Sequence, residues 1–275
     1  MLDLTSMKKR WVYHSTMYGK GEVYYMKNNK ATIFNVILDT FENEDIKELA
    51  KQMIDDIPDY FFDIGASSTG KYHPQYALGD LGLARHTVAL CKFMNHMFTI
   101  EQNKVKFTPR ERDILRLAGI MHDSRKSGEA DNKSRFTVFD HPILAANAMR
   151  KFKGVISTVT DEEIEMGAKA CECHMGEWST DKRSSVILPK PSDKYGELLH
   201  LCDYLASRKD IEVLFDNIPS TNVEVKLEDY KFTFGKYKGQ LITEVAKEHK
   251  DYLEWMKGNM KMQEPLNTFV NKLLA

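Results

Sequence analysis

The chain has 275 residues, of which 42% are hydrophobic and 29% are charged, and its formal net charge is −1. This composition is typical of a globular protein with one large domain and a small appendage. A net charge near zero excludes a general attraction to nucleic acid or to an anionic membrane, so any basic surface has to be local. No apolar run in the sequence approaches the roughly 20 residues that span a bilayer.

The first residues, MLDLTSMKKRW, lack the apolar core of a signal peptide. Four cysteines in a chain of this length do not indicate a disulfide framework. We therefore expect a cytoplasmic protein with reduced thiols and no membrane partner.

The N-terminal part is predicted to be rich in β-structure. Residues 11–38 contain many aromatic and β-branched side chains with a Gly-containing turn, GKGE, between them, which predicts a hairpin or small sheet. Residues 44–57 change to the apolar spacing of a helix. We expect residues 1–60 to form a β-hairpin-rich segment plus a helix, followed by a loop rich in Gly, Ser and Pro at 63–82.

Five helices are predicted in the middle of the chain. The first covers LARHTVALCKFMNHMF, and the second and fourth begin at capping boxes opened by Thr108 and Thr160. The third begins at the DHP sequence of residues 140–142, and the fifth follows Ser192 and includes LLHLCDYLASR. Helices joined by short or moderate connections predict an all-α domain, which we place at residues 61–215.

The pattern of apolar and polar residues changes again in the last part of the chain. Residues 222–240 alternate aromatic or β-branched side chains with polar ones, and LITEVAKEHKDYLEWMKGN has helical spacing. We expect a small α+β module at residues 222–275. The predicted fold class is therefore mainly α, with a small β-rich segment before the helical domain and a small α+β module after it.

Histidines and aspartates recur at comparable places on the five predicted helices. A charged aspartate on an apolar helix is costly to bury unless it is paired or binds a metal ion. Imidazole and carboxylate together suit Zn, Fe, Mn and related ions, and helix bundles build metal sites from side chains on separate helices. The candidate metal ligands are His86, His122, Asp123, His141, His174 and Asp203.

Each of these residues also has a simpler explanation. A single histidine on an apolar face is usually a hydrogen-bonded core residue, and His141 has the position of an ordinary helix-start residue. Asp203 is alternatively a partly exposed helix residue, or an ion-pair partner of Arg208 or Lys209. A structural zinc site at CECH, residues 171–174, lacks the second Cys/His pair that it needs. The joint order of the residues, one group to each helix, favours a metal centre.

This order resembles the HD superfamily of metal-dependent phosphohydrolases over about residues 60–210. The motifs that carry the resemblance are LARHT, IMHDSRK, FDHP, CHMGEW and HLCDYLASR. The resemblance implies one or two divalent ions (Mn, Fe, Ni, Co, Zn or Mg) bound by the six candidate ligands. Several members that hold two ions have His-His where this chain has His174-Met175, so the second ion would have one ligand fewer.

Two further motifs narrow the resemblance. YHPQYALGDLGLARHT and HMGEW are similar to HD-type 3′-to-5′ exoribonucleases and to phage HD proteins. In those proteins a longer OB-type module precedes the helical domain, whereas only about 40 β-rich residues are present here. Relatives of this kind imply a cytoplasm that is either bacterial or that of a phage host.

The resemblance also suggests roles around the metal ligands. Asp123, with two carboxylate oxygens, suits a bridge between two ions about 3.5–4 Å apart, which would lower the pKa of a bound water. Lys126 is placed to approach a phosphate as a point charge, or is a solvated lysine beside Arg125, which we include as a substrate-binding candidate. Lys71 and His73, in the GKYHP loop, are candidates for substrate contact and leaving-group protonation, unless the loop is a plain surface loop.

The sequence FTFGKYKGQLITEVAKEHKDYLEWM resembles the C-terminal module of exonuclease X-like proteins over about residues 229–258. Lysines alternate with aromatic residues there, and a surface of this kind suits single-stranded nucleic acid. Lys236 and Lys238 are the candidate contacts. Alternatively, the aromatic rings form the core of the module and the lysines keep it soluble.

We favour an enzyme, an HD-type metal-dependent phosphohydrolase acting on phosphate esters of nucleic acid or nucleotides, and within that class a single-strand nuclease. The first alternative is a phosphatase for small nucleotides or a cyclic-nucleotide phosphodiesterase. The alternative of another class is a non-catalytic nucleic-acid-binding protein in which the helices are only a scaffold. The sequence gives no indication of the oligomeric state.

Overall fold

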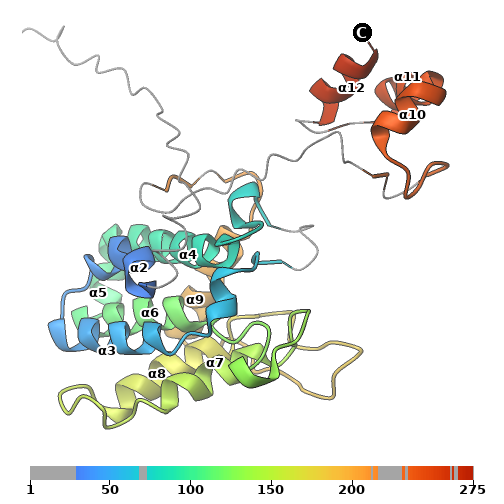
Figure 1. Ribbon diagram of the computed structural model, residues 1–275. Coiled ribbons are helices and arrows are strands. Elements are labelled where there is room, and N and C mark those ends of the chain that lie inside the picture. The colour runs from blue at the N-terminus through green and yellow to red at the C-terminus, as the bar shows by residue number, and fades with distance from the viewer. Residues whose placement is uncertain are drawn as a thin grey trace, which may run out of the picture. The chain divides into compact units, whose positions relative to one another are not determined.

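The computed structural model describes residues 29–67, 73–211, 213–215, 231–232, 235–260, 262 and 266–274. The chain divides into two compact units, Met1–Thr221 and Asn222–Ala275. The helices of the first unit are α2 (Lys30–Leu38), α3 (Glu44–Asp55), α4 (Gly82–Thr99), α5 (Glu101–Lys106), α6 (Pro109–Met121), α7 (His141–Arg150), α8 (Asp161–Glu172) and α9 (Lys194–Ala206) (Figure 1). Short 3-10 turns lie at Asp59–Phe62, Gln75–Ala77 and Ala130–Asn132.

Helix α6 is the central element of the first unit. It begins at the predicted capping box, in which Thr108 accepts from the Glu111 backbone and Glu111 accepts from that of Thr108. Its residues from Asp113 to Met121 are buried, which is the pattern of a helix surrounded on all sides. Accordingly it packs against α3, α4, α7, α8 and α9, and Figure 1 shows it between α4 and α8.

The five predicted helices are present as α4, α6, α7, α8 and α9. Helix α8 begins at the second predicted capping box, Thr160 with Glu163. Helix α9 begins at Asp193, whose carboxylate accepts from two backbone N–H groups of the first turn. Helices α4 and α6 approach closely at Gly119, where a Cβ atom would lie 2.9 Å from the Leu90 side chain. These N-terminal caps and helix–helix contacts set the position of each helix end in the interior.

The predicted β-structure at residues 11–38 is wrong where the structure describes it. Residues 30–38, KATIFNVIL, form helix α2, which buries Ile33, Phe34, Ile37 and Leu38. These positions recur at helical spacing, and Phe34 packs against Phe61 and Phe62. Tertiary packing therefore overrides the β propensity of the branched and aromatic residues. Residues 11–28 lie outside the described part of the chain.

A buried ion pair joins α6 to the start of α3. Asp113 Oδ2 accepts from the backbone N–H of Glu42 at 2.9 Å and from the backbone N–H of Asn43 at 2.7 Å. Its Oδ1 accepts from Arg116 Nη1 at 2.6 Å, and Arg116 Nε donates to Asn95 at 2.7 Å. Both charged groups thus have complete sets of partners in the interior, as buried charges require. Sequence patterns did not identify this pair.

The second unit contains α10 (Ile242–Glu248), α11 (Lys250–Asn259) and α12 (Leu266–Leu274) around a small apolar core. Where the structure describes the predicted hairpin, it has one antiparallel bridge, Lys231 with Leu241, and the described residues contain no strand; residues 222–230, 233 and 234 lie outside the described part. Gly235 and Gly239 adopt positive φ and let the chain turn tightly between the two residues of this bridge. Within the described residues, no helix has the length and apolar content of a transmembrane span.

Candidate metal centre

The six predicted ligands come together in the first unit. His86 lies within α4, and His122 is the C-cap of α6, so Asp123 follows directly. His141 is the first residue of α7, His174 follows the end of α8, and Asp203 lies in α9. The first five are at most 2% exposed, and the side chain of Asp203 is 21% exposed. The cluster therefore sits at the ends of buried helices and has one partly open side.

Asp123 is the centre of the cluster. Its Oδ1 lies 3.0 Å from His141 Nε2 and 3.7 Å from His174 Nε2. Its Oδ2 lies 3.4 Å from His122 Nε2 and contacts Lys126 Nζ. The two oxygens of one carboxylate therefore face different histidines.

Asp203 and His86 complete the opposite side of the cluster. Asp203 Oδ1 lies 2.9 Å from His86 Nε2 and 3.8 Å from His122 Nε2. Three groups have ligand atoms that all lie within 4.8 Å of one another. These groups are His86, His122 and Asp123; His122, His174 and Asp203; and Asp123, His141 and His174.

Three of the histidines are oriented in the same way. The Nδ1 atom of each lies within hydrogen-bond distance of the backbone carbonyl three residues earlier: Gly119 for His122 at 2.8 Å, Val138 for His141 at 2.7 Å and Cys171 for His174 at 2.7 Å. A neutral imidazole that donates from Nδ1 presents a lone pair at Nε2. Backbone acceptors therefore hold all three Nε2 lone pairs toward Asp123, as in histidines that bind metals.

Several buried polar atoms of the cluster lack a hydrogen-bond partner. His122 Nε2, His141 Nε2 and Asp123 Oδ1 are buried and make no aligned hydrogen bond, although they lie close together. Such atoms are costly to bury unless a ligand satisfies them. Imidazole nitrogens with carboxylate oxygens suit Mn, Fe, Co, Ni or Zn. The cluster therefore fits one or more divalent ions.

The charges in the cluster act on one another. Burial alone would raise the pKa of Asp123, but Lys126 and His122 hold it well below its usual range. Burial alone would lower the pKa of His122, but the Asp123 and Asp203 carboxylates raise it. Burial and His122 lower the pKa of His174 to about 3. Asp123 is thus an ionised carboxylate and His174 a neutral imidazole at pH 7, which are the forms that bind a cation.

The other predicted site residues of the first unit differ in placement. Lys126 is 12% exposed and paired with Asp123, so it is not the solvated lysine of the alternative explanation. Arg125 is directed to Asp56 and Glu129, and these acidic partners offset its charge. The ring centroid of His73 lies 5.1 Å from that of His86, and burial and His86 lower the pKa of His73 to about 3. Lys71 lies outside the described residues.

The two predicted lysines of the second unit are exposed. Lys236 and Lys238 flank Tyr237, which is buried in the small apolar core together with Phe232. This arrangement matches the alternative in which the aromatic residues form the core of the module. The lysines are free to face a polyanion, and the Lys236 ammonium lies 5.1 Å from the centroid of the Tyr237 ring.

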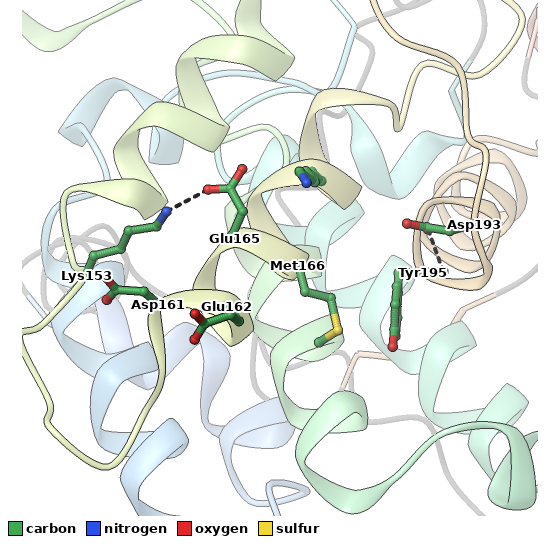
Figure 2. Close-up of a pocket in the computed structure, with 8 residues that line it drawn as sticks. Lys153, Asp161, Glu162, Glu165, Met166, Asp193 and Tyr195 are labelled. Atoms are coloured by element: carbon green, nitrogen blue, oxygen red, sulfur yellow. Dashed lines mark hydrogen bonds and ion pairs between the residues drawn. The ribbon is translucent and has the colours of Figure 1, made fainter.

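Sequence reasoning missed an aromatic group beside the ligands. Trp178 and Tyr204 stack in parallel near His174 and Asp203 in the sequence, and His200 lies against Trp178. The signal was the tryptophan in CHMGEW together with the spacing of four between His200 and Tyr204. A separate pocket, shown in Figure 2, is lined by Glu165, Met166, Asp193 and Tyr195 among others, and by none of the six ligands.

Comparison with known families agrees with this geometry. Residues 81–208 match the HD domain, and residues 232–261 match the exodeoxyribonuclease X-like C-terminal family. Searches of the curated proteins and of the solved structures give no match. The HD match indicates a metal-dependent hydrolase. The chain therefore contains an HD domain at residues 81–208, followed by a match to the exodeoxyribonuclease X-like C-terminal family at residues 232–261.

Proposed function

We propose that this protein hydrolyses phosphate esters of nucleic acid or nucleotides with one or two divalent ions, and that its substrate is a single-stranded nucleic acid. The observation that carries the proposal is the convergence of three backbone-anchored histidines on Asp123, whose Oδ1 has no aligned hydrogen bond. A purely structural carboxylate would have donors at both oxygens.

The ligands divide naturally into two sets. His122 lies on the Oδ2 side of Asp123 and near Asp203, which pairs with His86, whereas His141 and His174 lie on the Oδ1 side. His174 is also within reach of His122 and Asp203. With Asp123 shared between them, each set offers at least three ligand atoms. The chemistry that divalent ions supply at such a site is polarisation of a phosphoryl oxygen and a lower pKa of bound water.

Lys126 is the residue that we expect to contact a phosphate. It lies one helical turn beyond Asp123, with its ammonium against Asp123 Oδ2 and 12% of its side chain exposed. A cation in that position offsets the charge of the carboxylate and of a phosphoryl oxygen drawn to the same place. We retain His73 and Arg125 as weaker candidates, because His73 lies beside His86 and Arg125 is already paired.

The preference for nucleic acid rests on the second unit. Its match to an exodeoxyribonuclease X-like C-terminal family supports a polynucleotide substrate, and the exposed Lys236 and Lys238 supply local positive charge. The metal centre alone is equally suited to a small-nucleotide phosphatase or a cyclic-nucleotide phosphodiesterase. A comparison of substrates is therefore part of the test.

The first experiment compares wild type with Asp123→Ala and with the control Asp161→Ala, which removes an exposed carboxylate at the start of α8. Metal content is measured on the purified proteins, and hydrolysis is measured with Mn²⁺ on single-stranded RNA, single-stranded DNA and a nucleotide panel. We expect one or two ions in wild type and in the control, and none in Asp123→Ala, with hydrolysis lost together with the metal.

Two results would contradict the proposal. A wild type that binds no metal would make the cluster structural and favour the non-catalytic binding protein. A wild type that hydrolyses small nucleotides best, and whose activity on oligonucleotides is unchanged by Lys236→Ala with Lys238→Ala, would replace the nuclease by a nucleotidase.

A further inference from the structure

Two large aromatic side chains lie exposed beside the metal centre. Trp178 is 49% exposed and Tyr204 is 37% exposed. Their rings are nearly parallel, with an interplanar angle of 11° and centroids 6.2 Å apart. At this separation parallel rings are laterally offset, and their exposed fractions leave part of each side chain open to a third flat group.

The position of Trp178 is fixed relative to a metal ligand. His200 Nδ1 bonds to the backbone carbonyl of His174 at 2.7 Å, and its Nε2 lies 3.1 Å from Glu177 Oε2. The His200 ring in turn lies against Trp178, with centroids 6.0 Å apart. The turn between them passes through Gly176 at φ +59°, where a Cβ atom would lie 2.2 Å from the His200 ring. This tight turn ties Trp178 to the segment that carries His174.

The position of Tyr204 is fixed by α9. His200 and Tyr204 are spaced by four and so share one face of the helix, and Arg208 follows two residues after the end of the helix at Ala206. Asp203, the adjacent residue, turns inward to the cluster. The Arg208 guanidinium lies 4.2 Å from the centroid of Tyr204, and its Nε has no hydrogen-bond partner. A cation therefore adjoins the aromatic pair.

We propose that Trp178, Tyr204 and Arg208 form a stacking platform for a nucleobase of a single-stranded substrate whose neighbouring phosphate lies at the Asp123 cluster. Every base has a flat π face, and stacking on exposed aromatic rings next to arginine is how single strands are held without sequence readout. The Arg208 guanidinium adjoins the rings of the platform, whereas the pocket of Figure 2 is lined by the four acidic side chains of Asp161, Glu162, Glu165 and Asp193 against two lysines. The placement of the phosphate rests on the proposed function, whereas the stacking of the base does not.

The first test measures binding without turnover. The full-length protein, with chelator present, is titrated into dye-labelled tetrathymidylate, and fluorescence anisotropy gives the Kd. Loss of one stacked base should weaken binding about 10-fold or more in Trp178→Ala, whereas Trp178→Phe should retain most of the affinity. The control Val155→Ala removes an apolar side chain of similar exposure, 50%, and should leave the Kd unchanged.

The second test asks whether the base is what is recognised. Wild type should bind tetrathymidylate about 10-fold more tightly than an abasic strand of the same length, and Trp178→Ala should bind both strands equally. With Trp11 and Trp255 replaced by Phe, the fluorescence of Trp178 should be quenched by the first strand and not by the abasic one. A Kd that Trp178→Ala does not change, or an equal loss for both strands, would overturn the platform.

The third test separates the platform from the catalytic proposal. With Mn²⁺, Trp178→Ala should lose most of its hydrolysis of tetrathymidylate and keep that of the abasic strand at the wild-type rate. If wild type cleaves neither strand yet shows the base-dependent binding, the platform stands and the proposed hydrolysis falls. If both strands are cleaved by wild type and by Trp178→Ala with the same ratio of rates, the hydrolase stands and the platform falls.

Discussion

Two buried aspartates ten residues apart on and just beyond α6 have opposite surroundings. Asp113 is fully buried, and its oxygens receive two backbone N–H groups, the Asn43 amide and the Arg116 guanidinium. Asp123 is 1% exposed, yet its Oδ1 makes no aligned hydrogen bond and faces imidazole nitrogens. Burial is the same for both, so it is the completeness of the hydrogen bonding that distinguishes them.

The difference shows how a buried carboxylate can be assigned a role. A carboxylate whose acceptor sites are all filled by fixed donors joins parts of the fold, because its burial is compensated within the chain. Asp123 has one fixed cation, Lys126 at Oδ2, whereas its Oδ1 faces imidazole nitrogens and would be satisfied by a bound metal ion. Helix α6 therefore carries a structural charge near its start and is followed, just beyond its end, by a charge that is able to hold a cation.

The largest expected effect is loss of metal and activity in Asp123→Asn. The substitution keeps the shape but removes the charge shared by both ligand sets, so we expect metal binding to fall below detection and hydrolysis to fall by more than the roughly 100-fold that loss of an outer-shell partner costs. In chelator, the free energy of unfolding should fall by less than in Asp113→Ala, because Asp123 loses only the charge that faces Lys126, whereas Asp113 has fixed donors at both oxygens. Metal analysis, turnover and denaturant unfolding measure these three quantities.

The comparison fails if Asp123→Asn behaves as a structural variant. A loss of several kcal/mol of stability in chelator, with metal still bound, would place Asp123 in the same class as Asp113. Asp161→Ala serves as the control, because that carboxylate is exposed at the start of α8 and lies outside the cluster.

The next largest effect is expected for Asp113→Ala. It removes the charged partner of Arg116, which is 6% exposed, and leaves the backbone N–H groups of Glu42 and Asn43 without their acceptor. Breaking a buried pair from one side costs about 3–5 kcal/mol, so the free energy of unfolding should fall by that amount. Urea unfolding in chelator measures it.

Asp113→Ala should nevertheless keep its metal stoichiometry and its turnover per folded molecule at temperatures where it remains folded. A variant that unfolds normally but loses the metal would show that the ion pair positions the cluster as well as the helices. Glu162→Ala, which removes an exposed acidic side chain of α8, is the control for the loss of a negative charge.

The same contrast explains what sequence patterns could predict. Capping boxes and apolar spacing are local signals, so α6 and α8 were predicted with their starts at Thr108 and Thr160. The clustering of the six candidate ligands could be predicted because each carries a metal-competent side chain in family order. The Asp113–Arg116 pair was missed because its partners, 70 and 71 residues away at Asn43 and Glu42, leave no periodic signal.

Other errors have the same origin. Residues 31–38 have β-forming side chains but fold as α2, because Phe61 and Phe62 offer a surface that accepts a helical face. Lys126 had two explanations that sequence could not separate, and only its contact with Asp123 decides against the solvated one. For both segments the outcome depends on a particular tertiary contact, whereas sequence propensity reports only on neighbouring residues.

Binding of a metal ion should add less to the free energy of unfolding of wild type than the buried Asp113 pair contributes. Because an ion that binds only the folded state stabilises it by mass action, Mn²⁺ at 100 times its Kd should add about 2.7 kcal/mol to the free energy of unfolding. Thermal unfolding with Mn²⁺ and with chelator measures the shift in Tm. Mn²⁺ should not change the Tm of Asp123→Asn, whereas it should raise the Tm of Asp113→Ala, from a lower starting value, by as much as in wild type. An equal rise in the Tm of Asp123→Asn would mean that the ion binds elsewhere.

The smallest effect on stability is expected for Thr160→Ala, which should lower the free energy of unfolding without changing metal binding. Thr160 Oγ1 accepts from the backbone N–H of Glu163 at 3.2 Å, and loss of such a cap costs about 1 kcal/mol. Ser157→Ala, which removes an exposed hydroxyl from the preceding loop, is the matched control and should cost much less. Because the cap lies at the opposite end of α8 from His174, urea unfolding should change while the Kd for Mn²⁺ does not. A change in the Kd for Mn²⁺ of more than about twofold would contradict this expectation. It would show that loss of the cap at the start of α8 displaces His174 at the other end, so that even a loss of about 1 kcal/mol in stability alters the metal centre.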